Sequence, residues 1–325
     1  MAAMTARFKY FTGVDVGKHT LVIFESRTQK LLEIPNHKTA IKRYLQMQVP
    51  YQADTFLVCE TTGGYEALLL QTCAESGQTV HRANTFQVKA FIRSLGLHGK
   101  TDAIDARALA QYALERCHRL TQWHQPNENI KLLKQLMLRR QDLKQMATQE
   151  KNRLQAPDSN PFIQKTIRAI LRSINTQIQA IDTKMALIVK QNDDLRKKEQ
   201  IMTEITGVGS QTAYTLLATM PELGTMTRRQ TASLAGLAPH PRDSGTATGR
   251  RVIKGGRRDV RAILFMAAMS ARQHHPELKH FYLRLIQNGK KPIVAITAIM
   301  RKLITIINAK IRDFMIQNQL SLEQS

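Results

Sequence analysis

The stretch Thr55-Phe-Leu-Val-Cys-Glu60-Thr-Thr-Gly-Gly-Tyr65 decides how the first third of this chain folds. Its first residues are β-branched, aromatic or otherwise apolar, which predicts a buried strand, and the glycine pair ends that strand before a helix expected to begin near Tyr65. Glu60 would then lie at the C-terminal end of a strand, where open α/β sheets commonly carry their chemistry. The stretch therefore predicts an α/β domain with a carboxylate at its functional edge.

A second apolar run, from Tyr10 to Phe24, contains a charge in its middle. Its β-branched and aromatic residues, with Gly13 and Gly17, predict two strands joined by a tight turn. Asp15 falls within the first of these strands, where a carboxylate is unusual.

Two further acids occur in the segment Lys100 to Ala110, a strong helix former. A spacing of three residues places Asp102 and Asp105 on one helical face, where the like charges repel each other unless a cation lies between them. Taken one at a time, the acids have structural explanations: Asp102 as a helix N-cap, Asp105 as a partner for Lys or Arg, and Glu60 as an edge residue.

Taken together, the four acids favour a metal site. Oxygen ligands without a cluster of His or Cys suit Mg²⁺ or Mn²⁺, which would activate a nucleophile and stabilise charge on a transferring phosphoryl group. The predicted ligands are Asp15, Glu60, Asp102 and Asp105.

The net charge indicates a polyanionic partner. The 325 residues include 48 Lys and Arg against 25 Asp and Glu, a formal charge of +23. The excess grows along the chain: 15 − 10 = +5 for residues 1–126, 15 − 8 = +7 for 127–200, and 18 − 7 = +11 for 201–325. The acids are thus concentrated where catalysis is predicted, and the excess of base lies beyond.

The chain is expected to have three parts. Residues 1–126 form the α/β domain, with Pro126 at its boundary. Residues 127–200 lack strand alternation, and the region from Glu128 to Glu199 predicts two long helices in a hairpin, broken at Ala156 to Pro161. Apolar residues at helical spacing suit a core or a coiled-coil seam, in an arm that would join protomers or lie along nucleic acid.

Residues 201–325 begin with a helix, the turn Gly207-Val-Gly209 and a second helix. This order resembles a helix-hairpin-helix motif, in which Gly207 and Gly209 would let backbone N–H groups bind phosphate. A simple connection between two helices is the alternative. Helices are also predicted for Ala262 to Ala271 and for Pro292 to Phe314.

A loop from Gly236 to Arg261 is rich in Pro, Gly and small hydroxyl residues. Spacing alone favours a basic loop that clamps phosphates. Ser244 is nevertheless a candidate nucleophile, with Thr246 and Thr248 as lesser ones, because the surrounding cations would stabilise a pentacoordinate phosphoryl transition state. The cations predicted to bind nucleic acid are Arg242, Arg250, Arg251, Lys254, Arg257 and Arg258.

The remaining patterns bear on where the protein works. We expect a cytoplasmic protein without a membrane partner, because no apolar run approaches the roughly 18 residues that span a bilayer and the N-terminus lacks a secretory signal. The three scattered cysteines, Cys59, Cys73 and Cys117, are expected to pack as small apolar side chains.

The order of these motifs closely resembles the DEDD insertion-sequence transposases of the insertion sequence 110 family, which are described as bridge-RNA-guided recombinases. The resemblance rests on five segments: Gly13 to Lys18, Cys59 to Tyr65, Lys100 to Arg107, Gly207 to Gly209, and Gly236 to Gly256. It implies an α/β domain that is RuvC-like, of the ribonuclease H type, followed by a helical arm and a mainly helical transposase domain. The four acids would occupy the metal-binding DEDD positions, and Ser244 that of the serine that attacks DNA.

The resemblance also implies a phosphoserine intermediate assisted by Mg²⁺, a structured bridge RNA that pairs with donor and target DNA, and homodimers that assemble into a tetramer. The host would be a bacterium or an archaeon, with the active protein on the nucleoid. Two alternatives stay open. A RuvC-like hydrolytic nuclease, such as a junction resolvase, would need the acids but not Ser244, and a non-enzymatic nucleic-acid-binding protein would need neither.

Overall fold

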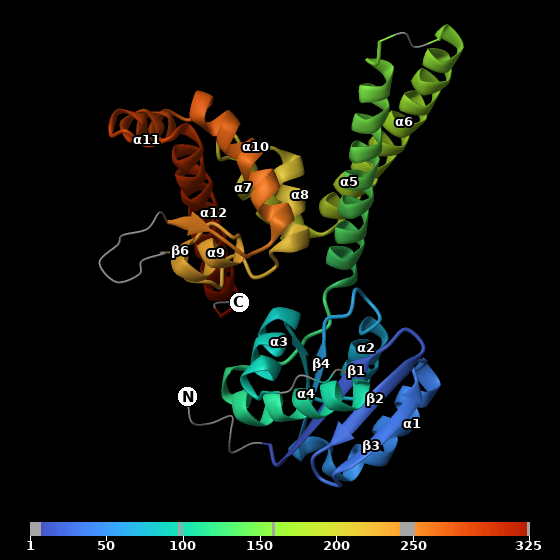
Figure 1. Cartoon of the computed structure of the whole chain (residues 1–325). Helices are drawn as coiled ribbons and strands as arrows, with labels where there is room; N and C mark the ends of the chain where they lie inside the picture. Colours follow the sequence, from blue (N-terminus) through green and yellow to red (C-terminus); the bar gives the residue numbers. More distant parts are fainter. Residues whose placement is uncertain (1–7, 97–98, 100, 158–159, 241–250, 324–325) are drawn as a thin grey trace. The chain divides into compact units, whose positions relative to one another are not determined.

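The computed structural model describes residues 8–323 except 97–98, 100, 158–159 and 241–250, with side chains as far as residue 318. The chain divides into two compact units, Met1–Pro126 and Asn127–Ser325, and each is described by itself. The first unit is mixed α/β and the second is almost wholly helical (Figure 1).

The first unit is built on one five-stranded sheet, in the order β3-β2-β1-β4-β5. Neighbouring strands are antiparallel for β1–β2 and β2–β3, and parallel for β1–β4 and β4–β5. The two strands predicted between Tyr10 and Phe24 are confirmed, as is the strand that ends at Glu60. The strands are β1 (Tyr10–Val16), β2 (Thr20–Glu25), β3 (Lys30–Pro35), β4 (Thr55–Glu60) and β5 (Val80–Ala83).

Helices cover both faces of this sheet. On one face, α1 (Lys38–Gln48) and α2 (Ala67–Glu75) pack against a core that includes Val14 and Cys59. On the other face, α3 (Thr85–Ser94) and α4 (Asp102–Arg116) pack against Phe11, Phe56 and Val58. Two short 3₁₀ turns complete the unit, Val49–Asp54 and Cys117–Arg119. The three cysteines are buried and free, as expected.

Helix α4 lies directly on β1 because Gly13 has no side chain. A Cβ atom at Gly13 would collide with the backbone carbonyl of Ala106 and lie 2.5 Å from the amide nitrogen of Ala110. The close approach brings the first turn of α4 within reach of the strand that carries Asp15.

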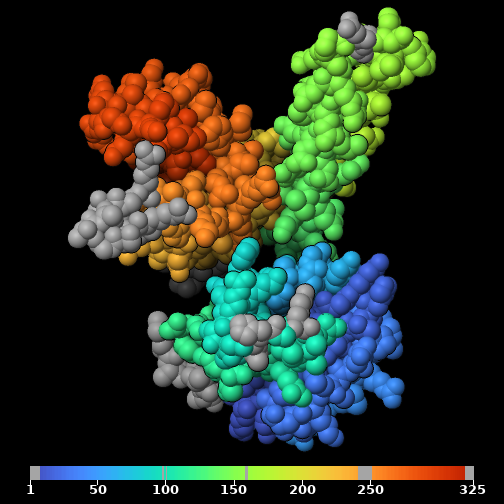
Figure 2. All heavy atoms as spheres, viewed as in Figure 1, coloured from blue at the N-terminus to red at the C-terminus, as the bar shows by residue number. Residues whose placement is uncertain are grey.

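The second unit begins with two long helices, α5 (Glu128–Leu154) and α6 (Pro161–Gln191), which lie side by side as an arm (Figures 1 and 2). Leu143, Ala147 and Ile174 are buried between them, and Arg140 Nε donates to Asp182 Oδ1 at 2.5 Å. The arm is held together by this apolar seam and one paired charge.

The second helix ends earlier than predicted. The side chain of Asn192 accepts a hydrogen bond from Leu195 N, which starts a separate helix, α7 (Asp193–Thr203). Asp193 and Asp194 occupy the first turn of α7, where the helix dipole favours negative charge. Residues 193–199, predicted as part of the hairpin, therefore belong to α7 instead.

The rest of the unit packs around one core, to which the base of the arm contributes Leu133 and Met185. The helices predicted for Ala262 to Ala271 and Pro292 to Phe314 are confirmed, and both are longer than predicted. The elements after α7 are α8 (Ser210–Thr219), α9 (Arg228–Leu234), β6 (Pro239–His240), β7 (Val252–Ile253), α10 (Arg258–His274), α11 (Pro276–Gln287) and α12 (Pro292–Glu323).

Helix α12 is long and apolar enough over Pro292–Asn318 to cross a membrane by length and composition. Its buried residues include Ile299, Leu303 and Ile307, which belong to the core of the second unit. Core packing thus explains the apolar residues on the buried face of this helix.

Candidate active site

Asp15 and Glu60 leave neighbouring strands at the same edge of the sheet. The parallel register of β1 and β4 pairs Val14 with Cys59, and Asp15 and Glu60 are the next residues on each strand. Val14 and Cys59 are buried on the side of α1 and α2, so alternation turns both carboxylates toward the face that α4 covers. Neighbouring strands lie about 4.8 Å apart, which makes Asp15 and Glu60 lateral neighbours.

The first turn of α4 lies toward the same edge. Ala106 meets Gly13 in the middle of β1, while Leu109 and Tyr112, further along the helix, share a core with Phe11 near the start of the strand. Helix α4 therefore runs opposite to β1, and its beginning points toward Asp15. Asp102 is exposed there, and Asp105 is partly buried.

Thr101, and not Asp102, caps this helix. The Thr101 hydroxyl accepts a hydrogen bond from Ile104 N at 3.2 Å, and Asp102 is the first helical residue. The explanation of Asp102 as an N-cap is therefore wrong, because the Thr101 side chain already accepts the hydrogen bond that an N-cap residue would accept.

The four carboxylates share an edge but do not form a complete ligand set. Within the described residues, no group of three or more His, Cys, Asp or Glu side chains is placed to hold a metal ion. Asp15, Glu60 and Asp105 each make a polar or electrostatic interaction in the chain. The chemistry of the four carboxylates suits Mg²⁺ or Mn²⁺, which take oxygen ligands, and the binding of either ion by these residues stays a prediction.

The loop that follows Glu60 is organised by a buried carboxylate that the sequence analysis did not identify. Glu66 accepts hydrogen bonds from Thr62 N at 3.2 Å and Gly64 N at 2.9 Å, and it pairs with Arg82 of β5 at 2.8 Å. Burial raises the pKa of Glu66, but the backbone N–H groups and the Arg82 guanidinium outweigh it, so its pKa is lowered. The signal in the sequence that could have identified Glu66 is its place as the acid that ends the segment Glu60-Thr-Thr-Gly-Gly-Tyr-Glu66.

Asn36 and Thr85 hold the backbone at the sheet edge where Asp15 and Glu60 lie. Asn36 Nδ2 donates to Gly17 O at 2.9 Å and to Tyr65 O at 3.2 Å, joining the end of β1 to the loop after β4. Thr85 Oγ1 donates to Thr61 O at 3.0 Å, which ties the start of α3 to the residue after Glu60. The backbone around both strand-end carboxylates is therefore held by side chains.

The two glycines of the predicted phosphate motif have different surroundings. Gly207 has a φ of +99°, and a Cβ atom there would lie 2.7 Å from Ala271 N. The lack of a side chain therefore lets the backbone of α10 pack closely against this turn. Gly209 faces open space and is the N-cap of α8, with no side chain capping the helix. Phosphate contacts by Gly207 and Gly209 both stay predictions, and the structure adds that Gly207 packs against α10.

The basic residues around the serine loop, which is the segment 241–251 between β6 and β7 that contains Ser244, also differ from one another. Arg257 donates to Glu222 Oε2 at 2.7 Å and Oε1 at 2.6 Å, so its guanidinium is engaged within the chain. Burial raises the pKa of Glu222, but the hydrogen bond from Arg257, a backbone hydrogen bond and the charges of Arg257 and Lys134 together outweigh burial, so the pKa is lowered. Arg251, Lys254 and Arg258 are exposed. Ser244, Arg242 and Arg250, with Thr246 and Thr248, lie outside the described residues.

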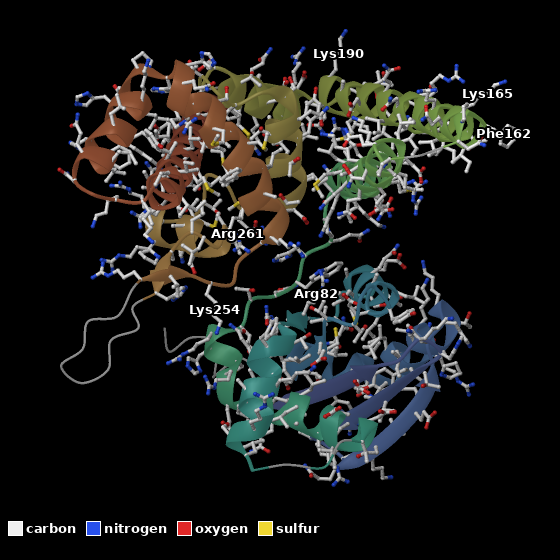
Figure 3. The ribbon with its side chains drawn as sticks, turned by 45° about the horizontal axis from the view of Figure 1, so that its top comes forward. Arg82, Phe162, Lys165, Lys190, Lys254 and Arg261 are labelled. Carbon is white, nitrogen blue, oxygen red and sulfur yellow. The ribbon has the colours of Figure 1, made fainter. Side chains whose placement is uncertain are left out.

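The ends of the serine loop are anchored by a short ladder and an arginine. Pro239 pairs with Ile253, and His240 with Val252, immediately before and after the loop. Arg261, in the first turn of α10, donates from Nη1 to Gly255 O at 2.8 Å. Figure 3 labels Arg261 together with Lys254, which precedes the helix. The role of Arg261 depends on this tertiary contact, and the sequence pattern had no signal for it.

Comparisons with known proteins identify both units. An IS110 DEDD model described as "Transposase" matches residues 12–157, and one described as "Transposase IS116/IS110/IS902 family" matches residues 199–283. The chain is 28% identical over 314 residues to the pilin gene-inverting proteins of Moraxella lacunata and Moraxella bovis, covering 94% of this chain and 96% of those proteins.

Two further matches are partial. The IS110 uncharacterized 43.6 kDa protein of Streptomyces coelicolor is 28% identical over 151 residues, which cover 46% of this chain and 36% of that protein. A solved structure of T. thermophilus RuvC in complex with a Holliday junction substrate aligns with 35% of this chain and 100% of its own, at 16% identity and a TM-score of 0.27.

Proposed function

The chain belongs to the IS110 family of transposases, and from this premise we propose that it cuts and rejoins DNA through a phosphoserine intermediate on Ser244. The observation that carries the proposal is the meeting of Asp15, Glu60 and the first turn of α4 at one edge of the sheet. Such a concentration of carboxylates suits the catalysis of phosphoryl transfer. The formal charge of +23 would attract a polyanionic substrate such as DNA.

The proposed chemistry conserves phosphodiester bonds. Ser244 Oγ attacks a DNA phosphorus atom, the bond from phosphorus to the leaving deoxyribose oxygen breaks, and the serine proton ends on that oxygen. In the second step, a deoxyribose hydroxyl of the new partner strand attacks the phosphoserine, and the serine leaves with a proton. No external energy source is needed, because each bond broken is matched by one formed.

The side chains have separate proposed tasks. Arg251, Lys254 and Arg258 are exposed near the ends of the serine loop, where they would neutralise charge that builds up on the phosphoryl oxygens. Asp15, Glu60, Asp102 and Asp105 are the carboxylates that would take a divalent ion. Since the described side chains do not form a closed ligand set, dependence on Mg²⁺ or Mn²⁺ is a prediction for experiment.

We also propose the partners that the family resemblance implies. These are donor and target DNA, a structured bridge RNA that supplies sequence choice, and further copies of the chain assembled as a dimer and then a tetramer. The excess of basic residues after residue 126 supports nucleic-acid binding, and the long α5–α6 arm offers a surface for assembly. The protein would act in the cytoplasm.

Hydrolysis by a RuvC-like nuclease is the main alternative, since it would use the same acids. The similarity to pilin gene-inverting proteins favours rejoining, because inversion of a gene requires that each cut end be joined to a new partner. A hydrolysed phosphodiester would leave ends that need a separate ligation step. Strand transfer through a covalent intermediate meets this requirement within one enzyme.

The test is a denaturing gel for protein attached to labelled DNA, with Mg²⁺ and RNA transcribed from the element's noncoding flank. We expect a covalent adduct with the wild type and with Thr246→Ala, and none with Ser244→Ala. Asp102→Ala should lose the adduct while keeping RNA binding. Cleavage without an adduct, equal in wild type and Ser244→Ala, would contradict the proposal and select hydrolysis.

A further inference from the structure

Two adjoining grooves lie on the second unit between the β6–β7 ladder, α9 and the first turns of α12. They have volumes of about 870 and 690 Å³ and share Pro239, Ala298 and Arg301 in their linings. We call the pair the α12 groove. It is distinct from the carboxylate edge, which belongs to the other unit.

Cations dominate the polar lining of the α12 groove. Its exposed basic residues include Arg228, Arg229, Arg251, Lys290, Lys291 and Arg301. Neither lining contains an acidic residue, and within the described part of the chain none of these six side chains forms an ion pair. Elsewhere in the unit, Arg140 and Arg257 are neutralised by Asp182 and Glu222. The described residues of the groove therefore carry a positive potential that suits a polyanion.

The floor of the α12 groove is mainly aliphatic, with Phe281 at its side, and it is open to solvent. Ile293 and Val294 are 56% and 51% exposed, and Val252 and Ile253 of β7 are 36% and 38% exposed. A nucleic-acid duplex presents phosphates and hides the faces of its bases, so it would gain little from such a floor. An unpaired strand exposes apolar base faces and sugars, which would cover these side chains while its phosphates contact the cations.

A second copy of the chain is a poor occupant of the same groove. A two-fold symmetric contact would bring the six cations of one copy against the same six of the other. Like charges placed together across an interface repel each other and disfavour association. The apolar floor is thus unsuited to self-association through this face.

We propose that the α12 groove binds the unpaired DNA strand that is being cut, with phosphates on its cations and bases on its aliphatic floor. The choice of DNA rests on the proposed function: Pro239, Val252 and Ile253 line the groove and form the ladder that brackets the loop with Ser244. A strand held there would run beside the point where the serine loop leaves the domain.

The test measures binding by fluorescence anisotropy, using the full chain and a labelled single-stranded oligodeoxynucleotide of about 12 nucleotides. The groove variant combines Lys290→Gln, Lys291→Gln and Arg301→Gln. A control of equal charge combines Lys165→Gln, Lys190→Gln and Lys279→Gln, all exposed and outside the groove; Figure 3 labels the first two on α6.

Loss of three phosphate contacts should weaken binding about 50-fold at 0.15 M salt and reduce the slope of log K against log salt by about 2. The control variant should stay within about threefold of the wild type, since its lysines contact no bound phosphate. Equal losses in the two variants would overturn the groove as a site, because general charge would then explain binding. Thermal melting checks that both variants remain folded.

The aliphatic floor gives a second, charge-free test. Ile293→Ser with Val294→Ser should weaken binding of the unpaired strand about 10-fold and leave binding of a duplex unchanged, whereas Leu283→Ser, exposed on α11, should affect neither. Equal effects on strand and duplex, or tighter binding of RNA than of DNA of the same sequence, would overturn the assignment. Since binding needs no chemistry, loss of the Ser244 adduct alone would count against the proposed function and not against the groove.

Discussion

Glu66 and Arg82 form an ion pair at 2.8 Å next to the loop that follows Glu60. The Glu66 side chain is 2% exposed and the Arg82 side chain 41%, so the carboxylate is buried and the guanidinium reaches solvent. Two amides of the loop, those of Thr62 and Gly64, donate to the same carboxylate. The backbone that directly follows the strand-end carboxylate Glu60 is thus held by a buried acid.

Glu66→Gln should destabilise the first unit by about 1–3 kcal/mol, because the replacement weakens the loop hydrogen bonds and leaves Arg82 without its partner. Urea unfolding followed by circular dichroism measures the loss. Glu75→Gln is the matched control: the ion pair of Glu75 with Lys38 is largely exposed to solvent, so its loss should cost much less stability than the loss of the Glu66 ion pair. Equal costs for the two variants would show that the loop does not depend on Glu66.

The lowered pKa values of Glu66 and Glu222 predict acid sensitivity in both units. A carboxyl whose pKa is lower in the folded state contributes stability that is present above its ordinary value of 4.5 and is lost as the pH falls through the folded value. Melting temperatures measured from about pH 6 to pH 3 should fall less steeply for Glu66→Gln than for the wild type. Parallel curves would contradict the assignment.

Gly207→Ala should destabilise the second unit by about 2–4 kcal/mol, since the new methyl group would meet α10 at a backbone angle that alanine disfavours. Gly209→Ala should change stability little, because its position is open. Thermal unfolding separates the two. Similar melting temperatures for both variants would contradict the packing role of Gly207.

Arg257 and Arg258 are adjacent but should behave differently. Arg257→Ala removes both partners of the Glu222 carboxylate oxygens and should cost about 1–2 kcal/mol of stability. Arg258→Ala should leave stability within about 0.5 kcal/mol and weaken nucleic-acid binding, because its side chain is exposed. Chemical unfolding and anisotropy on the same preparations test both statements, and a reversed pattern would refute them.

Removal of divalent ions should stop DNA cleavage, and Mg²⁺ or Mn²⁺ should restore it. Asp15→Asn and Glu60→Gln should each lower the rate by at least about 100-fold without changing the melting temperature by more than a few degrees. Glu33→Gln, on the exposed part of β3, serves as the control. Full activity in chelator would show that these acids do not act through a metal.

Several features of this protein followed from local sequence patterns. The strands around Asp15 and before Glu60, the helix after Lys100 and the turn at Gly207 each have a short-range signal: alternation, a glycine pair, a capping residue or a spacing of three. Such signals act between residues near in sequence, so they predict element type well. Boundaries were less exact: α2 begins at Ala67, beyond Tyr65, and α6 ends at Gln191, where Asn192 caps the next helix.

Contacts between distant residues were decided by tertiary structure alone. In the sequence Arg257 resembled its exposed basic neighbours. Folding brings it into contact with Glu222, which lies 35 positions away in the chain. The packing of Gly207 against α10 had no signal in the sequence, and the cations of the α12 groove come from four separated segments. A side chain's partner depends on which segments the core brings together, and that choice is a property of the whole fold.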